Sequence, residues 1–127
     1  AVAKALPELK GKLTGNAIRV PTPNVSLAII NLSLEQGTDR DSLNAYLQQM
    51  ALSSALHRQI DYSASTELVS SDMVGSRFAG IVDSQATIAE GDHCVLYVWY
   101  DNEFGYSCQV VRVMEQMAGV VRQDLPA

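Results

Sequence analysis

One segment constrains the fold of this chain more than any other: the nearly all-apolar run Cys94-Val95-Leu96-Tyr97-Val98-Trp99-Tyr100. Its β-branched and aromatic residues are typical of a central strand that neighbours cover on both faces. Polar residues follow, and a terminal helix is then predicted to open near Gly105 or Ser107. The apolar residues of this helix recur at the spacing of one face and predict a buried stripe: Val110, Val113, Met114, Met117 and Val121.

Other strands are predicted on both sides of this run. Alternating residues indicate a strand over Asn16–Val20, and a longer one follows over Val25–Glu35. The apolar phase of the longer strand switches near Ile29, which predicts either a bulge or a strand covered on both faces. Extended pieces are expected near Ile60 and Val69 and over two further ranges, 78–83 and 86–89. The loop 90–92 then predicts a hairpin into the central strand.

Two more helices are expected. Residues 1–6 favour a helix that stops near Pro7, because the residue before a proline is pushed out of the helical region. Thr38 and Asp41 resemble a capping box that opens a helix reaching Ser53 or Ser54. Strands that dominate the middle of the chain, with separate helices, predict an α+β fold in which helices layer one face of a sheet.

Composition bounds the function. A length of 127 residues suits a single domain spanning 1–127. The net charge is −5 and the nine Lys and Arg residues are scattered, which argues against a nucleic-acid partner. The sequence contains no run of 18 apolar residues, so no membrane span is expected. No signal-peptide pattern is visible at its start. The two cysteines form no disulfide framework, so we expect reduced thiols in a cytoplasmic protein.

Two blocks carry a family resemblance. The first runs from Pro7 through Gly15 and continues as Arg19-Val20-Pro21-Thr22-Pro23-Asn24-Val25-Ser26, and the second is Trp99-Tyr100-Asp101-Asn102-Glu103-Phe104-Gly105-Tyr106-Ser107. Both resemble hallmark segments of phosphorylating glyceraldehyde-3-phosphate dehydrogenases, and Val69-Ser70-Ser71-Asp72 between them also matches. The chain is similar to the C-terminal part of that family's catalytic domain. The resemblance implies an α+β fold with a mixed, largely antiparallel sheet.

The resemblance also implies what the intact enzyme does. It would oxidise D-glyceraldehyde 3-phosphate with NAD or NADP and inorganic phosphate to 1,3-bisphosphoglycerate, as a cytoplasmic homotetramer. This sequence contains neither the glycine-rich motif of a dinucleotide-binding domain nor the family's Ser-Cys-Thr-Thr-Asn-Cys tract. We therefore expect a C-terminal fragment without its N-terminal dinucleotide-binding domain, without a catalytic nucleophile, and inactive alone.

Arg19 and Asn102 are the site residues that the resemblance implies. The Arg of the Arg-Val-Pro-Thr block binds the substrate phosphate in the family, and a guanidinium is a planar, permanently charged fork that suits phosphate. The Asn of the Trp-Tyr-Asp-Asn-Glu tract binds the nicotinamide carboxamide, and an amide can both donate and accept. Tyr106 is expected beside the nicotinamide, and Glu103 is expected to cap the last helix.

Other candidate residues favour structural roles. Cys94 lies in an apolar strand and Cys108 opens a helix, but neither occupies the family's nucleophile position. His57 and His93 have no Cys or carboxylate partner at a telling spacing, and no metal-ligand pattern is present.

Two alternatives remain open. The parent enzyme could act on erythrose 4-phosphate, if the residues that discriminate between the two substrates lie in the other half of such enzymes. The isolated domain could instead be a non-catalytic folding and oligomerisation module, with its sheet as the self-association surface.

Overall fold

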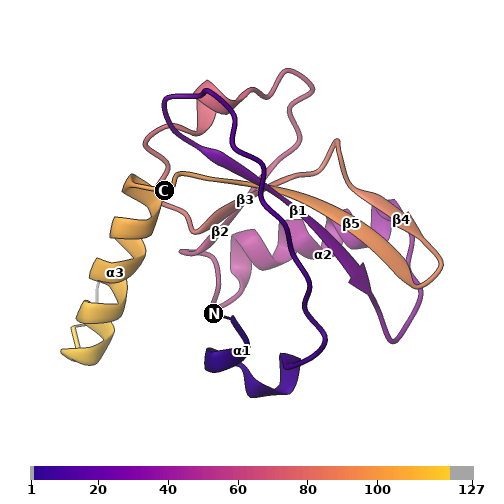
Figure 1. Ribbon diagram of the computed structural model, residues 1–127, viewed down its shortest axis with the longest axis horizontal. Helices are drawn as coiled ribbons and strands as arrows, with labels where there is room; N and C mark the ends of the chain where they lie inside the picture. Colours follow the sequence, from indigo (N-terminus) through magenta and orange to yellow (C-terminus); the bar gives the residue numbers. More distant parts are fainter. Residues whose placement is uncertain (1, 121–127) are drawn as a thin grey trace.

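The computed structural model of the protein describes residues 2–120. Figure 1 shows a twisted sheet with helices at its edges and ends. The elements, in chain order, are α1 (Val2–Ala5), the 3-10 helix η1 (Pro7–Leu9), β1 (Ser26–Ser33), α2 (Arg40–Ser53), β2 (Ile60–Ser63), the 3-10 helix η2 (Ser70–Met73), β3 (Gly80–Asp83), β4 (Ile88–Glu90), β5 (His93–Tyr100) and α3 (Phe104–Met117).

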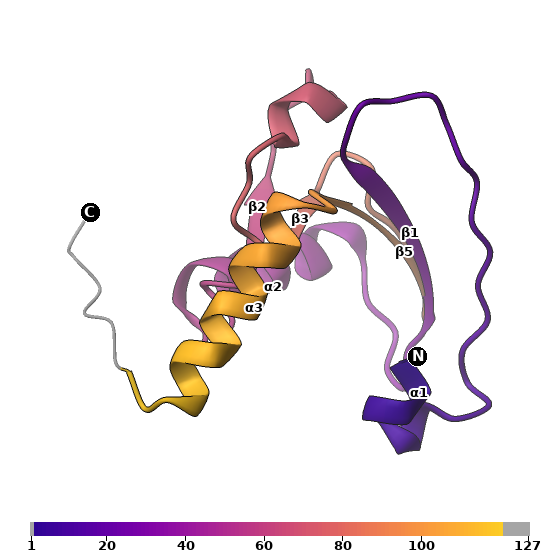
Figure 2. The ribbon, with the colours of Figure 1, turned by 60° about the vertical axis from the view of Figure 1, so that its left-hand side comes forward.

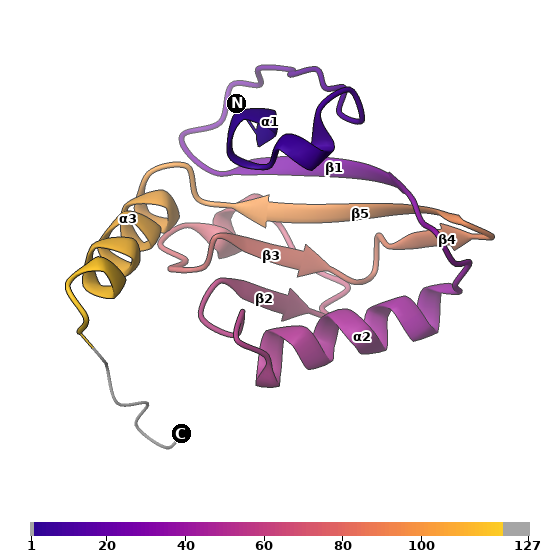
Figure 3. The same ribbon diagram turned by 90° about the horizontal axis from the view of Figure 1, so that it is seen from below.

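The sheet is mixed and largely antiparallel, as expected. Its order is β1-β5-β3-β2, and β4 pairs with β5 beyond the end of β3. The pairs β1–β5, β3–β5 and β4–β5 are antiparallel, whereas β2 and β3 are parallel. Figure 3 shows α2 along the β2 side of this sheet and α1 on the opposite side, beyond β1. The predicted α+β class, the central β5 and the β4–β5 hairpin are therefore confirmed.

The bulge considered for β1 is wrong. β1 and β5 pair without interruption from Ser26↔Tyr100 to Ser33↔His93. The phase switch near Ile29 places apolar side chains on both faces of β1, and neither face is fully covered, because Leu27, Ile29, Ile30 and Leu32 all remain exposed. The change of apolar phase along β1 therefore reflects apolar residues on both faces of the strand and not an inserted residue.

The strand predicted over Asn16–Val20 is also wrong. Residues 13–20 form no regular element, and Figure 2 shows this stretch as a long open loop running beside β1. Ile18 is 87% exposed, so the alternating pattern has no neighbouring strand to pair with among residues 2–120. Alternation favours an extended backbone, but strand structure also needs a hydrogen-bonding partner.

Helix α2 starts one residue later than the predicted capping box. Asp39 is the N-cap: its Oδ1 accepts the backbone N–H of Ser42 at 2.9 Å, and its Oδ2 accepts the Ser42 hydroxyl at 2.9 Å. Thr38 and Asp39 are both favoured at N-caps, so local sequence does not separate them. The helix ends at Ser53, as expected.

The apolar stripe of α3 is present but not buried, contrary to the prediction. Val110, Val113 and Met114 are exposed, and Met117 is 83% exposed; Val121 lies outside the described residues. In Figures 1 and 3, α3 lies beyond the end of β5 and not on the sheet. Within the described part of the chain, no helix is long and apolar enough to cross a membrane.

The start of α3 makes an unusually close backbone contact. A Cβ on Gly105 would lie 2.8 Å from the carbonyl oxygen of Phe78 and 3.1 Å from that of Ser76. Gly105 is buried, and both obstacles are backbone atoms that no rotamer change can move. Glycine is therefore required here to bring the helix N-terminus against the loop before β3.

We predict that Gly105→Ala destabilises the chain although alanine favours helices. The helical preference would contribute about 1 kcal/mol, whereas overpacking against fixed backbone costs roughly 1–3 kcal/mol or more. Urea unfolding should show a net loss of about 1–2 kcal/mol. Gly15→Ala is the matched control, because no heavy atom lies within 4 Å of its Cβ position. Equal stabilities of the two variants would contradict the close contact.

Candidate functional site

The buried carboxylate of Asp101 organises the junction between β5 and α3. Its Oδ1 accepts the backbone N–H groups of Glu103 (2.9 Å) and Phe104 (2.8 Å), and its Oδ2 accepts that of Gly75 (2.9 Å). The side chain is only 2% exposed. Asp101 therefore caps the helix and ties it to the loop after η2.

The capping role predicted for Glu103 is wrong. Glu103 occupies the N-cap position, but its side chain makes no capping hydrogen bond. The buried carboxylate of Asp101, two residues earlier, caps the helix instead by accepting the backbone N–H groups of Glu103 and Phe104.

Hydrogen bonds to the charged form lower the pKa of Asp101. The Gly75 N–H contributes most, burial opposes it, and Phe104, Asn24 and Glu103 add further lowering, so the pKa falls from 3.8 to about 2. A carboxylate that accepts several N–H bonds is stabilised as the anion. The group thus stays ionised wherever the protein is folded at ordinary pH.

The turn before β1 is strained. Val25 has a φ of 75°, in the left-handed region that costs a β-branched residue roughly 1–3 kcal/mol. Its side chain is buried with Met73 and Ile81, and such burial contributes roughly 1.5–3 kcal/mol. Asn24 accepts the Val25 N–H at 2.7 Å, and its side chain also lowers the pKa of Asp101. Packing and polar contacts together hold the strained turn.

Asn102 follows at the end of β5, at the rim of a small pocket. The pocket has a volume of about 240 Å³ and is lined by Ala79, Tyr100, Asp101, Asn102, Tyr106 and Gln109. The Asn102 Oδ1 accepts a hydrogen bond from the Ser26 hydroxyl at 2.7 Å. The pocket thus combines an oriented amide with two tyrosines, a set that suits a flat ring bearing a carboxamide.

Arg19 lies in the open loop, seven residues before Ser26, and its side chain is exposed. Among residues 2–120 it makes no side-chain hydrogen bond or ion pair with a carboxylate. No hydrogen bond among the described residues joins Arg19 to Asn102. The structure therefore presents the Arg19 cation to solvent.

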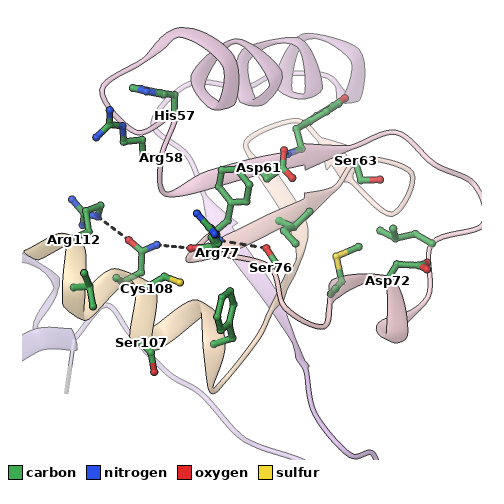
Figure 4. Close-up of a pocket in the computed structure, with 18 of the residues that line it drawn as sticks. His57, Arg58, Asp61, Ser63, Asp72, Ser76, Arg77, Ser107, Cys108 and Arg112 are labelled. Atoms are coloured by element: carbon green, nitrogen blue, oxygen red, sulfur yellow. Dashed lines mark hydrogen bonds between the residues drawn. The ribbon is translucent and has the colours of Figure 1, made fainter. Parts of the chain in front are cut away.

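A larger groove of about 1130 Å³ separates α3 from β2, η2 and the loop before β3. Figure 4 shows basic side chains around the groove, from Arg58, Arg77 and Arg112; Asp61 and Asp72 also line it, with Asp72 at the end away from α3. Its remaining lining is mostly apolar: Leu68, Met73, Phe78, Ile81, Phe104 and Val111 among others. Gln109 bridges its edge by accepting from Arg112 (2.9 Å) and donating to the Arg77 carbonyl (3.0 Å).

The cysteines and histidines form no catalytic pair in the described range. Cys94 is buried, and burial raises the pKa of its thiol, which disfavours a reactive thiolate. Cys108 lines the groove but has no histidine bonded to its sulfur among residues 2–120. His57 Nδ1 lies 2.9 Å from the Ser54 carbonyl, and His93 Nδ1 lies 3.3 Å from the Ser33 hydroxyl. Nothing in this range groups three metal-ligating side chains.

Residues 1–102, which include both Arg19 and Asn102, match the family model described as glyceraldehyde 3-phosphate dehydrogenase, C-terminal domain. The chain belongs to this family. The resemblance drawn from the two sequence blocks is thereby confirmed, and the mixed sheet agrees with it.

Relatives from distant organisms carry the same family name. A glyceraldehyde-3-phosphate dehydrogenase-like protein of Pseudomonas aeruginosa is 70% identical over 94% of this chain and 26% of its own length. Glyceraldehyde-3-phosphate dehydrogenases of Echinococcus multilocularis and Jaculus orientalis muscle are each 44% identical, over 91% and 93% of this chain and 34% and 32% of their own lengths. The chain thus spans about a quarter to a third of these relatives.

We predict that acid removes the contribution of Asp101 to stability. The folded-state pKa lies below the ordinary value, so the contribution is complete above pH 3.8 and is lost as pH falls towards 2. Urea unfolding at pH 5, 4, 3 and 2 should show this loss. Hydrogen bonds from Ser42 also lower the pKa of Asp39, which adds to the slope in the same direction.

Asp101→Asn isolates the effect. The amide cannot accept all three N–H bonds, so the variant should be less stable at pH 5 and should lose less on acidification than the wild type. Asp39→Asn is the control for the Asp39 contribution. Parallel pH curves for the wild type and Asp101→Asn would refute the assignment.

Proposed function

We propose that this chain supplies the C-terminal substrate and cofactor contacts of a phosphorylating glyceraldehyde-3-phosphate dehydrogenase. The intact enzyme would oxidise D-glyceraldehyde 3-phosphate with NAD or NADP and inorganic phosphate to 1,3-bisphosphoglycerate. One observation carries the proposal: the family match contains both Arg19 and Asn102, each within its hallmark block. Family membership supports the dehydrogenase class, and the two residues support the individual roles.

Arg19 is assigned to the substrate phosphate. Its exposed guanidinium has no carboxylate partner within residues 2–120, so its donors are available. A guanidinium binds phosphate oxygens through paired, charge-assisted hydrogen bonds and keeps its charge at every physiological pH. It would hold the anionic end of the substrate while the aldehyde end reacts.

Asn102 is assigned to the nicotinamide carboxamide. It lies beside Tyr106 in the small pocket, which fits a flat ring with an amide substituent. When bound, the cofactor supplies hydride acceptance. The residues of this chain would orient the ring, because a carboxamide held by Asn102 fixes which face of the ring the substrate meets.

The nucleophile of the reaction must lie elsewhere. Acyl transfer needs a thiolate next to a base, but Cys94 is buried with a raised pKa, and Cys108 does not match the family's nucleophile block. The 127-residue chain alone should therefore not reduce NAD. The matched residues make up only 26% and 34% of two relatives, which is consistent with a nucleophile supplied by a different part of such enzymes.

A chimera tests the roles of Arg19 and Asn102. The chain would replace the matching third of the Echinococcus multilocularis enzyme, to which it is 44% identical over 117 residues. We expect turnover by the chimera and none by the chain alone. A chimera that folds, by circular dichroism and gel filtration, but is inactive would contradict the proposal.

Within this chimera, Arg19→Ala should raise KM for the phosphorylated aldehyde about 100-fold or more, the scale of a lost bidentate charged contact. Affinity for NAD should not change. Arg19→Lys should recover part of the loss, because lysine keeps the charge but not the fork. Lys12→Ala removes an exposed cation from the same loop and is the matched control. Equal KM values for Arg19→Ala and Lys12→Ala would refute the assignment. Comparing the rates with D-glyceraldehyde 3-phosphate and erythrose 4-phosphate would decide between the two substrates.

An assembly role is the second candidate, and the exposure of β1 favours it. Leu27, Ile29, Ile30 and Leu32 are between 38% and 56% exposed, with Leu27 and Ile29 on one face of the strand and Ile30 and Leu32 on the other. Exposed apolar residues that gather on one face of a sheet mark association sites. We propose that copies of the chain associate through this sheet, as expected for a homo-oligomer.

Ile29→Asp tests the association. Ile29 is 56% exposed, so the substitution should cost less than about 1 kcal/mol of stability, but it should weaken self-association about tenfold or more because a charge would enter an apolar interface. Sedimentation equilibrium measures the effect. Leu52→Asp, on α2, is the control on another surface, with 74% exposure. A monomeric wild type, or equal association of both variants, would refute the assembly role.

A further inference from the structure

The amide of Asn102 is held by a residue 76 positions away in the sequence. The Ser26 hydroxyl donates to Asn102 Oδ1 at 2.7 Å. The contact depends on strand register, because Ser26 pairs with Tyr100 at the end of the β1–β5 ladder and Asn102 lies just beyond it. No other hydrogen bond of the Asn102 side chain occurs among residues 2–120, so both N–H donors of its Nδ2 remain available.

Both partners of this hydrogen bond are held rigidly. Ser26 follows the strained residue Val25, whose side chain is buried in the core. Asn102 follows Asp101, whose carboxylate accepts three backbone N–H groups. A solvent-exposed hydrogen bond usually competes with water and costs side-chain entropy. Here the backbones at Ser26 and at Asn102 are already fixed, so forming the hydrogen bond costs little additional conformational entropy.

We propose that Ser26 is a positioning residue that turns the Asn102 amide so that Nδ2 faces the small pocket. The inference rests on the proposed contact between Asn102 and the cofactor. With Oδ1 engaged by Ser26, Asn102 offers donors and selects a carbonyl oxygen on its ligand. The opposite orientation would present Oδ1 and select an N–H group instead.

This assignment gives a function to the strained turn at Val25. Strained backbone persists where the surroundings over-determine it, and it is enriched at functional sites. Asn24, Val25 and Ser26 are consecutive, and they contact the Asp101 side chain, the core and Asn102 respectively. The left-handed φ at Val25 therefore places a hydroxyl against the amide while its neighbours anchor the turn.

Nuclear magnetic resonance of the 127-residue chain tests the positioning without any ligand. In the wild type, the Asn102 side-chain amide protons should show contacts to Tyr106 or Gln109 and none to the Ser26 β-protons. In Ser26→Ala, the two amide proton shifts should converge and the nitrogen order parameter should fall. Ser26→Thr keeps a hydroxyl and should restore both signals.

Ser33→Ala is the matched control, because Ser33 lies at the other end of β1 and its hydroxyl contacts His93 instead. Melting temperatures of all variants should agree within about 3 °C, which separates positioning from loss of fold. An unchanged Asn102 amide in Ser26→Ala, or amide contacts to Ser26 in the wild type, would overturn the inference.

The chimera distinguishes this inference from the proposed function. Ser26→Ala should raise KM about three- to tenfold, the scale of one hydrogen bond, with both NAD and its 3-acetylpyridine analogue, because both keep the carbonyl oxygen. The kcat for phosphorylated aldehyde should change less than KM. If Asn102→Ala leaves KM for NAD unchanged, the proposed contact between Asn102 and the cofactor is refuted. The orientation of the Asn102 amide is tested separately by the nuclear magnetic resonance spectra. An effect of Ser26→Ala with NAD alone would overturn the donor assignment.

Discussion

The carboxylate of Asp101 is the interaction on which the arrangement of the candidate site depends. It is buried and accepts N–H groups from the loop after η2 and from the first turn of α3. A buried charge is tolerated only when it is well compensated, and here backbone dipoles, including those of a helix N-terminus, provide the compensation. The Asn24 side chain also lowers the pKa of this group, so the carboxylate connects the end of β5 and the start of α3 with the turn that leads into β1.

From this anchor the site follows geometrically. The hydrogen bonds of Asp101 fix the backbone direction at Asn102, the next residue. Ser26 lies beside Asn102 because it pairs with Tyr100 at the end of the β1–β5 ladder. The strain at Val25, roughly 1–3 kcal/mol, is of the same size as the roughly 1.5–3 kcal/mol gained by burying its side chain. The turn is therefore sustained by packing against Met73 and Ile81 and not by its own conformational preference. Stability and placement of the amide are coupled through three consecutive residues.

The sequence predicted the elements whose signals are local. The apolar run of β5, the hairpin at Gly91 and the cap region of α2 all rest on residues close together in the chain, and each is found. The strand expected over Asn16–Val20 failed because pairing is a non-local requirement. The sequence alone does not single out the contact of Asp101 with Gly75 or that of Ser26 with Asn102, because these partners lie 26 and 76 residues apart. Only the position of Ser26 within the first family block gave a signal that could have singled it out.

The apolar stripe of α3 shows the other limit of pattern reasoning. Periodicity specifies which face of a helix favours burial, but it does not specify what buries that face. Val110, Val113 and Met114 have the expected spacing and remain exposed, while Gly105 at the start of the same helix is buried against the Phe78 carbonyl. The helix is therefore fixed at its N-terminus by polar and backbone contacts and not along its apolar face. This division explains why the site at the β5–α3 junction is well defined although most of α3 contributes little to the core.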